Sequence, residues 1–183
     1  MKTLFFVLVV SVLYAACTGT TSGSKENSDS TANASTTSGT SSISYPYTAS
    51  FSSKISRGKD SNALLVLNSY KAWENGDMTA LANTFSDSMD ITFSDGSEFK
   101  GTRDSAIAMA KKYRDSLSSV KIDMNVWMPV HADDKNGDAV LAWYTETDTY
   151  KNGKVDSMYF HDINGIKDGK IDFIESYGRK AKK

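Results

Sequence analysis

The sequence predicts an α+β domain in which three N-terminal helices pack in a curved antiparallel sheet. Apolar residues recur at helical spacing in three segments between residues 60 and 117. From Val120 onward they alternate with polar residues, which is the period of a β-strand. Asn136-Gly137, Asn152-Gly153 and Asp168-Gly169 interrupt this second half, as expected for tight turns between consecutive strands.

The first 16 residues have the features of a secretory signal peptide. Lys2 precedes an apolar run of about ten residues, whereas a membrane-spanning helix needs about 20. Leu13-Tyr14-Ala15-Ala16-Cys17 then resembles the lipobox of bacterial lipoproteins. Cys17 is the only cysteine, so it has no internal disulfide partner, and the resemblance implies that it carries a lipid that anchors the protein to a membrane. The alternative is ordinary signal cleavage that leaves an unpaired cysteine.

The cell envelope is the expected location of such a protein. An Asp directly after the lipidated cysteine would resemble an inner-membrane retention signal. Thr18 stands at this position instead, so the outer membrane is favoured. Residues 17–53 are rich in Ser, Thr, Gly, Asn and Ala and bury too little apolar surface to fold, so we expect a disordered tether. Residues 54–183 have the usual size of one domain. The formal net charge of −1 argues against a nucleic-acid partner.

Capping residues delimit the three predicted helices. Asp60 or Ser61 is the expected N-cap of the first, which ends at Asn75-Gly76, and Asp77 and Thr102 are the expected caps of the second and third. The residues expected to face the core are Ala63, Val66, Leu67, Tyr70 and Trp73 in the first helix, Met78, Leu81, Ala82 and Phe85 in the second, and Ala106, Ile107, Met109, Ala110, Tyr113 and Leu117 in the third. Asp95-Gly96 predicts a hairpin of two short strands within residues 89–99.

Four longer strands are expected at residues 120–132, 139–150, 155–163 and 170–177. Bulges in strands of this length would curl the sheet into a half-open cone, with a cavity between sheet and helices. Residues 164–175 imitate an EF-hand calcium loop, but Ile166 replaces a ligand and the pattern is that of a hairpin. The sequence therefore predicts neither a metal site nor a cofactor.

The domain resembles the nuclear transport factor 2-like superfamily, and within it the SnoaL-like and ketosteroid isomerase branch. The resemblance covers the whole domain and is strongest at residues 73–77 (Trp-Glu-Asn-Gly-Asp), at Gly101 and at residues 168–171 (Asp-Gly-Lys-Ile). It implies the cone-shaped fold. These are turn and packing signatures, so they favour a fold more than a chemistry.

The resemblance also allows catalytic positions to be compared. The position of the isomerase's catalytic Asp corresponds to Phe93, whose ring cannot accept a proton. The position of its tyrosine donor corresponds to Ser69, with Tyr70 one residue away, and the acidic partner falls near His161. SnoaL-like cyclases use a His and Asp pair, which makes His161 the weak catalytic candidate. Asp162 is adjacent to His161 and points to the opposite face of a regular strand.

Aromatic and polar residues from separate elements are expected to line the cone. The predicted ligand-binding residues are Ser69, Tyr70, Trp73, Phe93, Trp143, Tyr159 and His161. Strand parity decides whether Trp143 or Tyr144 faces the helices, and the sequence leaves this open. Trp127 shares a face with Asp123 and Asn125, so we expect it on the outer surface, where it would fit a homodimer interface.

Three functions follow as hypotheses. The first is noncatalytic binding of a small apolar molecule in the cone. The second is a protein interaction or dimerisation module that uses the outer sheet face. The third is an isomerase, cyclase or dehydratase that uses His161 with Tyr70 or Ser69.

Overall fold

The computed structural model describes residues 43–181. The predicted signal peptide, Cys17 and residues 18–42 of the predicted tether lie outside this range. In the part of the chain that the structure describes, no helix is both long and apolar enough to cross a membrane.

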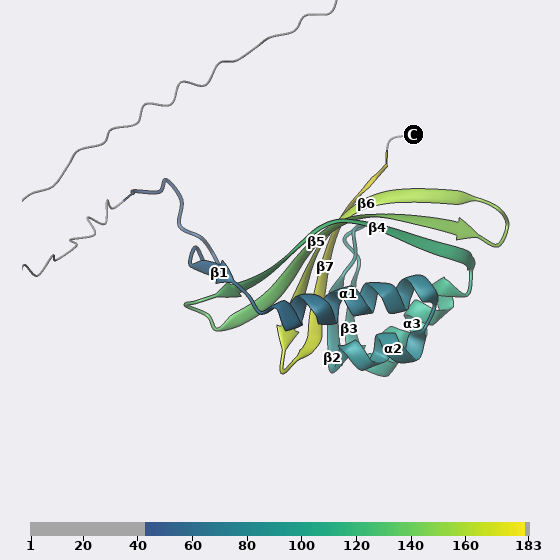
Figure 1. The fold of residues 1–183 in the computed structure, drawn as a ribbon, viewed down its shortest axis with the longest axis horizontal. Coiled ribbons are helices and arrows are strands. Elements are labelled where there is room, and N and C mark those ends of the chain that lie inside the picture. The colour runs from purple at the N-terminus through teal and green to yellow at the C-terminus, as the bar shows by residue number, and fades with distance from the viewer. Residues whose placement is uncertain (1–42, 182–183) are drawn as a thin grey trace, which may run out of the picture. The chain divides into compact units, whose positions relative to one another are not determined.

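The predicted α+β fold with three helices and a curved sheet is confirmed, and Figure 1 shows the helices together on one side of the sheet. The helices are α1 (Asp60–Asn75), α2 (Met78–Thr84) and α3 (Arg103–Arg114). The strands are β1 (Ile55–Arg57), β2 (Phe85–Thr92), β3 (Glu98–Thr102), β4 (Leu117–Ala132), β5 (Gly137–Tyr150), β6 (Val155–Lys167) and β7 (Lys170–Lys180).

All seven strands form one sheet in the order β1-β4-β5-β6-β7-β2-β3. The expectation of a purely antiparallel sheet is wrong, because β2 runs parallel to β7 while every other pair is antiparallel. The difference arises because β2 precedes the long meander β4 to β7 in the chain and pairs with its last strand. No tight turn joins β2 to β7, so nothing forces the two to run in opposite directions.

Local capping signals shape two helices as expected. Asp77 accepts a hydrogen bond from the backbone N–H of Ala80 at 2.8 Å, and Thr102 accepts one from Ser105 at 3.3 Å. Gly76 ends α1 in the left-handed region, at φ +71°, where a side chain would be strained.

Three helix boundaries differ from the prediction, and the strands β4 to β7 are each longer than expected. Lys59, not Asp60 or Ser61, occupies the N-cap of α1, and Asp60 instead pairs with Arg57 at 2.6 Å. Phe85 begins β2 instead of continuing the second helix, and Leu117 begins β4 instead of extending the third. Both side chains are buried, so their apolar character marked the core correctly but not the backbone conformation.

The sheet is curved by irregularities of the kind that the cone requires. Register shifts interrupt β4 near Leu117 and between Met124 and Val126, and another lies between β6 and β7 at Gly165. The core lies where the helices meet the sheet. It contains Val66, Ala72, Leu81, Phe85, Met89, Ile91, Ala106, Val140 and Ile171.

Candidate functional site

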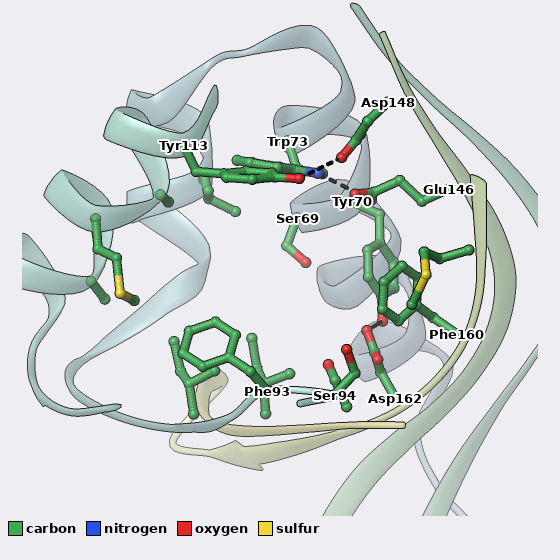
Figure 2. Close-up of a pocket in the computed structure, with 18 of the residues that line it drawn as sticks. Ser69, Tyr70, Trp73, Phe93, Ser94, Tyr113, Glu146, Asp148, Phe160 and Asp162 are labelled. Carbon is green, nitrogen blue, oxygen red and sulfur yellow. Dashed lines mark hydrogen bonds between the residues drawn. The ribbon is translucent and has the colours of Figure 1, made fainter. Parts of the chain in front are cut away.

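A cavity of about 690 Å³ lies between the helices and the inner face of the sheet. All three helices contribute to its wall, together with β2, β5, β6 and β7. Figure 2 shows aromatic rings and carboxyl groups from these elements arranged around one hollow. Its volume lies within the range of small-molecule sites.

Four of the seven predicted binding residues line this cavity: Ser69, Tyr70, Trp73 and Phe93. The Ser69 hydroxyl donates to the carbonyl of Val66 within its own helix at 2.7 Å, so its proton is engaged there. The Phe93 ring lies on the cavity side opposite Trp73 in Figure 2.

The other three predicted residues, Trp143, Tyr159 and His161, do not line the cavity, and their placement in the cone was wrong. Successive side chains of a strand point to opposite faces, and β5 and β6 turn their even-numbered residues inward. Trp143 and His161 are cross-strand partners on the outer face, where their rings stack with centroids 4.4 Å apart. His161 therefore cannot act as acid or base on a molecule inside the cavity.

Asp162 occupies the inward position next to His161 and forms the centre of a buried hydrogen-bond network. The hydroxyls of Tyr70 and Tyr144 both donate to its Oδ2, at 2.9 and 2.8 Å. The side-chain amide of Asn164 donates to the Tyr70 oxygen at 3.1 Å. Burial raises the pKa of Asp162, although the hydrogen bonds from the tyrosines oppose this shift. Burial and the nearby Asp162 charge likewise raise the pKa of both tyrosines.

Two further acids lie side by side on β5 and are held by aromatic donors. Trp73 donates its indole N–H to Oε2 of Glu146 at 3.1 Å, and Tyr113 donates its hydroxyl to Oδ2 of Asp148 at 2.8 Å. The rings of Trp73 and Tyr113 stack with centroids 6.2 Å apart and an interplanar angle of 12°. Figure 2 shows this pair closing one end of the cavity.

The environment of Glu146 favours its protonated form. Burial and then the negative charge of Asp148 raise the pKa of Glu146 to about 8. Burial also raises the pKa of Asp148, against the hydrogen bond from Tyr113. At neutral pH Glu146 is therefore mostly a carboxylic acid beside a buried carboxyl group.

Carboxyl groups, without basic side chains, give the lining its charge. None of the described residues that line the cavity is Lys, Arg or His. Arg114 lies behind the wall and donates to the carbonyls of Trp73 and Glu74. Within residues 43–181, no group of three or more His, Cys, Asp or Glu side chains is arranged to hold a metal ion.

The polar centre of the site consists of Tyr113, Tyr144, Glu146, Asp148 and Asp162. The sequence predicts Tyr113 in the core and leaves Tyr144 open as the alternative to Trp143, but it does not predict Glu146, Asp148 or Asp162 as site residues. A signal was present in β5, where the even positions 140 to 150 read Val, Ala, Tyr, Glu, Asp, Tyr and the odd positions 145 to 149 are all Thr. The pattern shows two distinct faces. It does not say which of them meets the helices.

Solved structures share this fold at low sequence identity. An LEH-like epoxide hydrolase from M. tuberculosis is 13% identical, with a TM-score of 0.56 over 66% of this chain and 84% of its own. An NTF2-like protein of unknown function from Exiguobacterium sp. 255-15 is 18% identical, with a TM-score of 0.54 over 64% and 99%. A candidate polyketide cyclase from Xanthomonas campestris pv. campestris is 18% identical, with a TM-score of 0.52 over 64% and 90%.

These likenesses show an NTF2-like fold, as the sequence resemblance implied. The sequence itself matches no family model and no curated protein. The proteins that share the fold carry names of different activities, so the function of this chain has to be argued from its own cavity.

Proposed function

We propose that this protein is a lipid-anchored lipoprotein of the bacterial cell envelope whose domain binds a small, largely apolar molecule in its cavity, without catalysis. The observation that carries the binding proposal is the cavity itself. It is a hollow of about 690 Å³ walled mainly by aromatic and aliphatic side chains from the helices and the sheet. Ligand sites in proteins have this size and composition, with a few polar groups that fix orientation.

The noncatalytic part of the proposal rests on the groups that reach the cavity. Phe93 stands where the related isomerase has its base, and a phenyl ring cannot accept a proton. The Ser69 hydroxyl is engaged with its own helix, and the hydroxyls of Tyr70 and Tyr144 are engaged with Asp162. Groups held in this way orient a ligand more readily than they transform it.

A cavity-filling substitution tests binding. Ala110 lies on the cavity side of α3, so Ala110→Phe would place a ring in the hollow. Ala108 lies on the exposed side of the same helix, and Ala108→Phe is the matched control. We expect small molecules released by denaturing the natively purified protein to be detected by mass spectrometry for the wild type and Ala108→Phe, and lost for Ala110→Phe. Equal retention by both variants would place the ligand elsewhere.

The anchor is supported by the sequence of residues 1–17, and a substitution tests it. We expect the wild-type protein to partition with membranes and to carry a mass increment of acyl chains on Cys17. The Cys17→Ser protein is expected to lose both. A wild-type protein with an unmodified cysteine would instead indicate ordinary signal cleavage.

Self-association through the outer sheet face is a second candidate. Val126, Trp127 and Met128 are consecutive and expose 48%, 48% and 45% of their surfaces. The bulge between Met124 and Val126 shifts the register, so Trp127 pairs with the inward-facing Ala142, and its expected place on the outer surface was wrong. Val126 and Met128 pair with Trp143 and Leu141 on the outer face, where they form an exposed apolar patch. Such a patch fits a self-complementary contact between two copies of the chain.

A further inference from the structure

The cavity acids are only half satisfied by the protein. Asp148 accepts a bond on Oδ2, and its other oxygen, Oδ1, is buried and has no partner among the described residues. Asp162 accepts two bonds on Oδ2, while its Oδ1 is equally buried and without a partner within residues 43–181. Asp162 is only 2% exposed and Asp148 8%. Buried carboxylate oxygens without a donor are costly, so a site of this kind favours a donor brought by a ligand.

The donors that the protein does supply are neutral. Trp73, Tyr113, Tyr70 and Tyr144 orient the acids but add no positive charge to balance them. Asp156, a half-buried acid of the lining, lies 3.9 Å from Lys154 and 3.8 Å from Lys180, so the fold does neutralise this acid. The interior acids Glu146 and Asp148 have no basic side chain beside them among the described residues that line the cavity.

The aromatic rings beside these acids complete an environment that suits a cation. The stacked rings of Trp73 and Tyr113 border Glu146 and Asp148. Aromatic faces attract an ammonium group, and they do so more strongly where water is excluded. Away from these acids, Ile91, Phe93 and Ile174 supply apolar wall against which an apolar body can lie.

We propose that the ligand of this cavity is an organic ammonium with an apolar body, whose charged nitrogen binds at Glu146 and Asp148 beside the rings of Trp73 and Tyr113. The inference deepens the proposed binding function and rests on it. The ammonium supplies hydrogen-bond donors to the free carboxyl oxygens, and the apolar body lies against the aliphatic and aromatic wall. An anionic ligand of the same shape would meet the acids instead and be rejected.

The protonation of Glu146 supports this assignment. Without a cation, a proton neutralises the pair, as the pKa of about 8 for Glu146 indicates. The titratable and charged groups near Glu146 and Asp148 set this balance together with the donor Trp73. They are Tyr70 from α1, Tyr113 and the more distant Arg114 from α3, Tyr144 and Asp148 from β5, and Asp156 and Asp162 from β6. A bound ammonium takes the place of that proton, so binding near pH 7 releases close to one proton.

Three probes of equal length separate the cases: n-octylammonium, 1-octanol and octanoate. Isothermal titration calorimetry at pH 7, on the mature chain of residues 17–183 carrying Cys17→Ser, measures each affinity. We expect octylammonium to bind at least tenfold more tightly than octanol, and octanoate to bind most weakly. Titrations in buffers of different ionisation enthalpy are expected to show the release of close to one proton for octylammonium and none for octanol.

Variants assign the effect to the acids. We expect Glu146→Gln and Asp148→Asn each to weaken octylammonium binding at least fivefold more than they change octanol binding. Asp123→Asn, which removes an exposed acid on β4, is the control and is expected to alter neither. Octanol binding as tight as that of octylammonium would overturn the cation inference while leaving the binding function standing. Binding of none of the three probes would overturn both.

Discussion

The hydroxyl of Tyr144 on β5 donates a hydrogen bond to Oδ2 of Asp162 on β6, with 2.8 Å between the oxygens. Tyr70 on α1 donates to the same carboxylate oxygen, so this single acid ties a helix to two neighbouring strands. Both bonds form in the buried wall of the cavity, where an unpaired carboxylate is costly.

Removing the two hydroxyls is expected to destabilise the fold more than removing either one. A single Tyr144→Phe change loses one charge-assisted bond and should lower the free energy of unfolding by about 1–2 kcal/mol at pH 7. The double change Tyr70→Phe with Tyr144→Phe leaves Asp162 without either donor and should cost about 3 kcal/mol or more. Urea unfolding measures both values. Tyr177→Phe, on the exposed end of β7, is the control, and an equal loss there would contradict a special role of the network.

The stability of the domain is expected to fall as the pH rises from about 4.5 to about 8. The pKa of Glu146 is about 8 in the folded protein and near 4.5 in the unfolded chain, so the folded state binds the additional proton over this interval. Its stabilising effect is complete below the unfolded pKa and is lost as the pH passes the folded value. Glu146→Gln is expected to flatten this dependence by roughly 2 kcal/mol, less than the full shift, because Asp148 shares the coupling. Urea unfolding between pH 4.5 and 9 checks this, and an unchanged slope in the variant would refute it.

His161 is expected to support the outer face and not the cavity. His161→Ala removes the ring that stacks on Trp143 and should cost about 1 kcal/mol of stability, with octanol affinity unchanged. His161→Phe keeps a stacked ring and removes the buried Nε2, which has no partner within residues 43–181. This variant should be as stable as the wild type, or up to about 1 kcal/mol more stable. Thermal unfolding together with calorimetry distinguishes the variants, and loss of binding in either would return His161 to the site.

Val126→Glu is expected to convert a dimer of the protein into a monomer. The change places a charge in the exposed apolar patch that Val126 and Met128 form on the outer face of the sheet. A charge buried without a partner at such a contact costs several kcal/mol. Sedimentation equilibrium of the two proteins measures the change in mass, and a monomeric wild type would refute self-association at this face.

Local signals in the sequence were sufficient for much of the fold. Asp77, Thr102 and Gly76 mark helix ends through contacts with residues at most four positions away, and such contacts can be read along the chain. The parallel pairing of β2 with β7 joins distant segments, and no local pattern predicts its direction.

The site could be predicted only in part, for a related reason. Residues on α1 are oriented by the helical period and by the core residues beside them, so Tyr70 and Trp73 were placed correctly. The side chains of β5 and β6 alternate between two faces, and the sequence does not show which face points inward, because both carry aromatic and polar side chains. The prediction took His161 as inward and named Trp143 as a lining residue while leaving its phase against Tyr144 open, and a shift of one residue exchanges these two for Tyr144 and Asp162.

The parallel pairing of β2 and β7 has a consequence for how the chain reaches its native state. The hairpin of β2 and β3 joins the sheet only through β7, which is the last strand of the described residues in sequence order. The wall of the cavity that β2 and β7 form therefore cannot be completed until nearly all of the domain has been synthesised. The cavity therefore takes shape only after the last of these strands has paired, so the capacity to hold a molecule follows completion of the sheet.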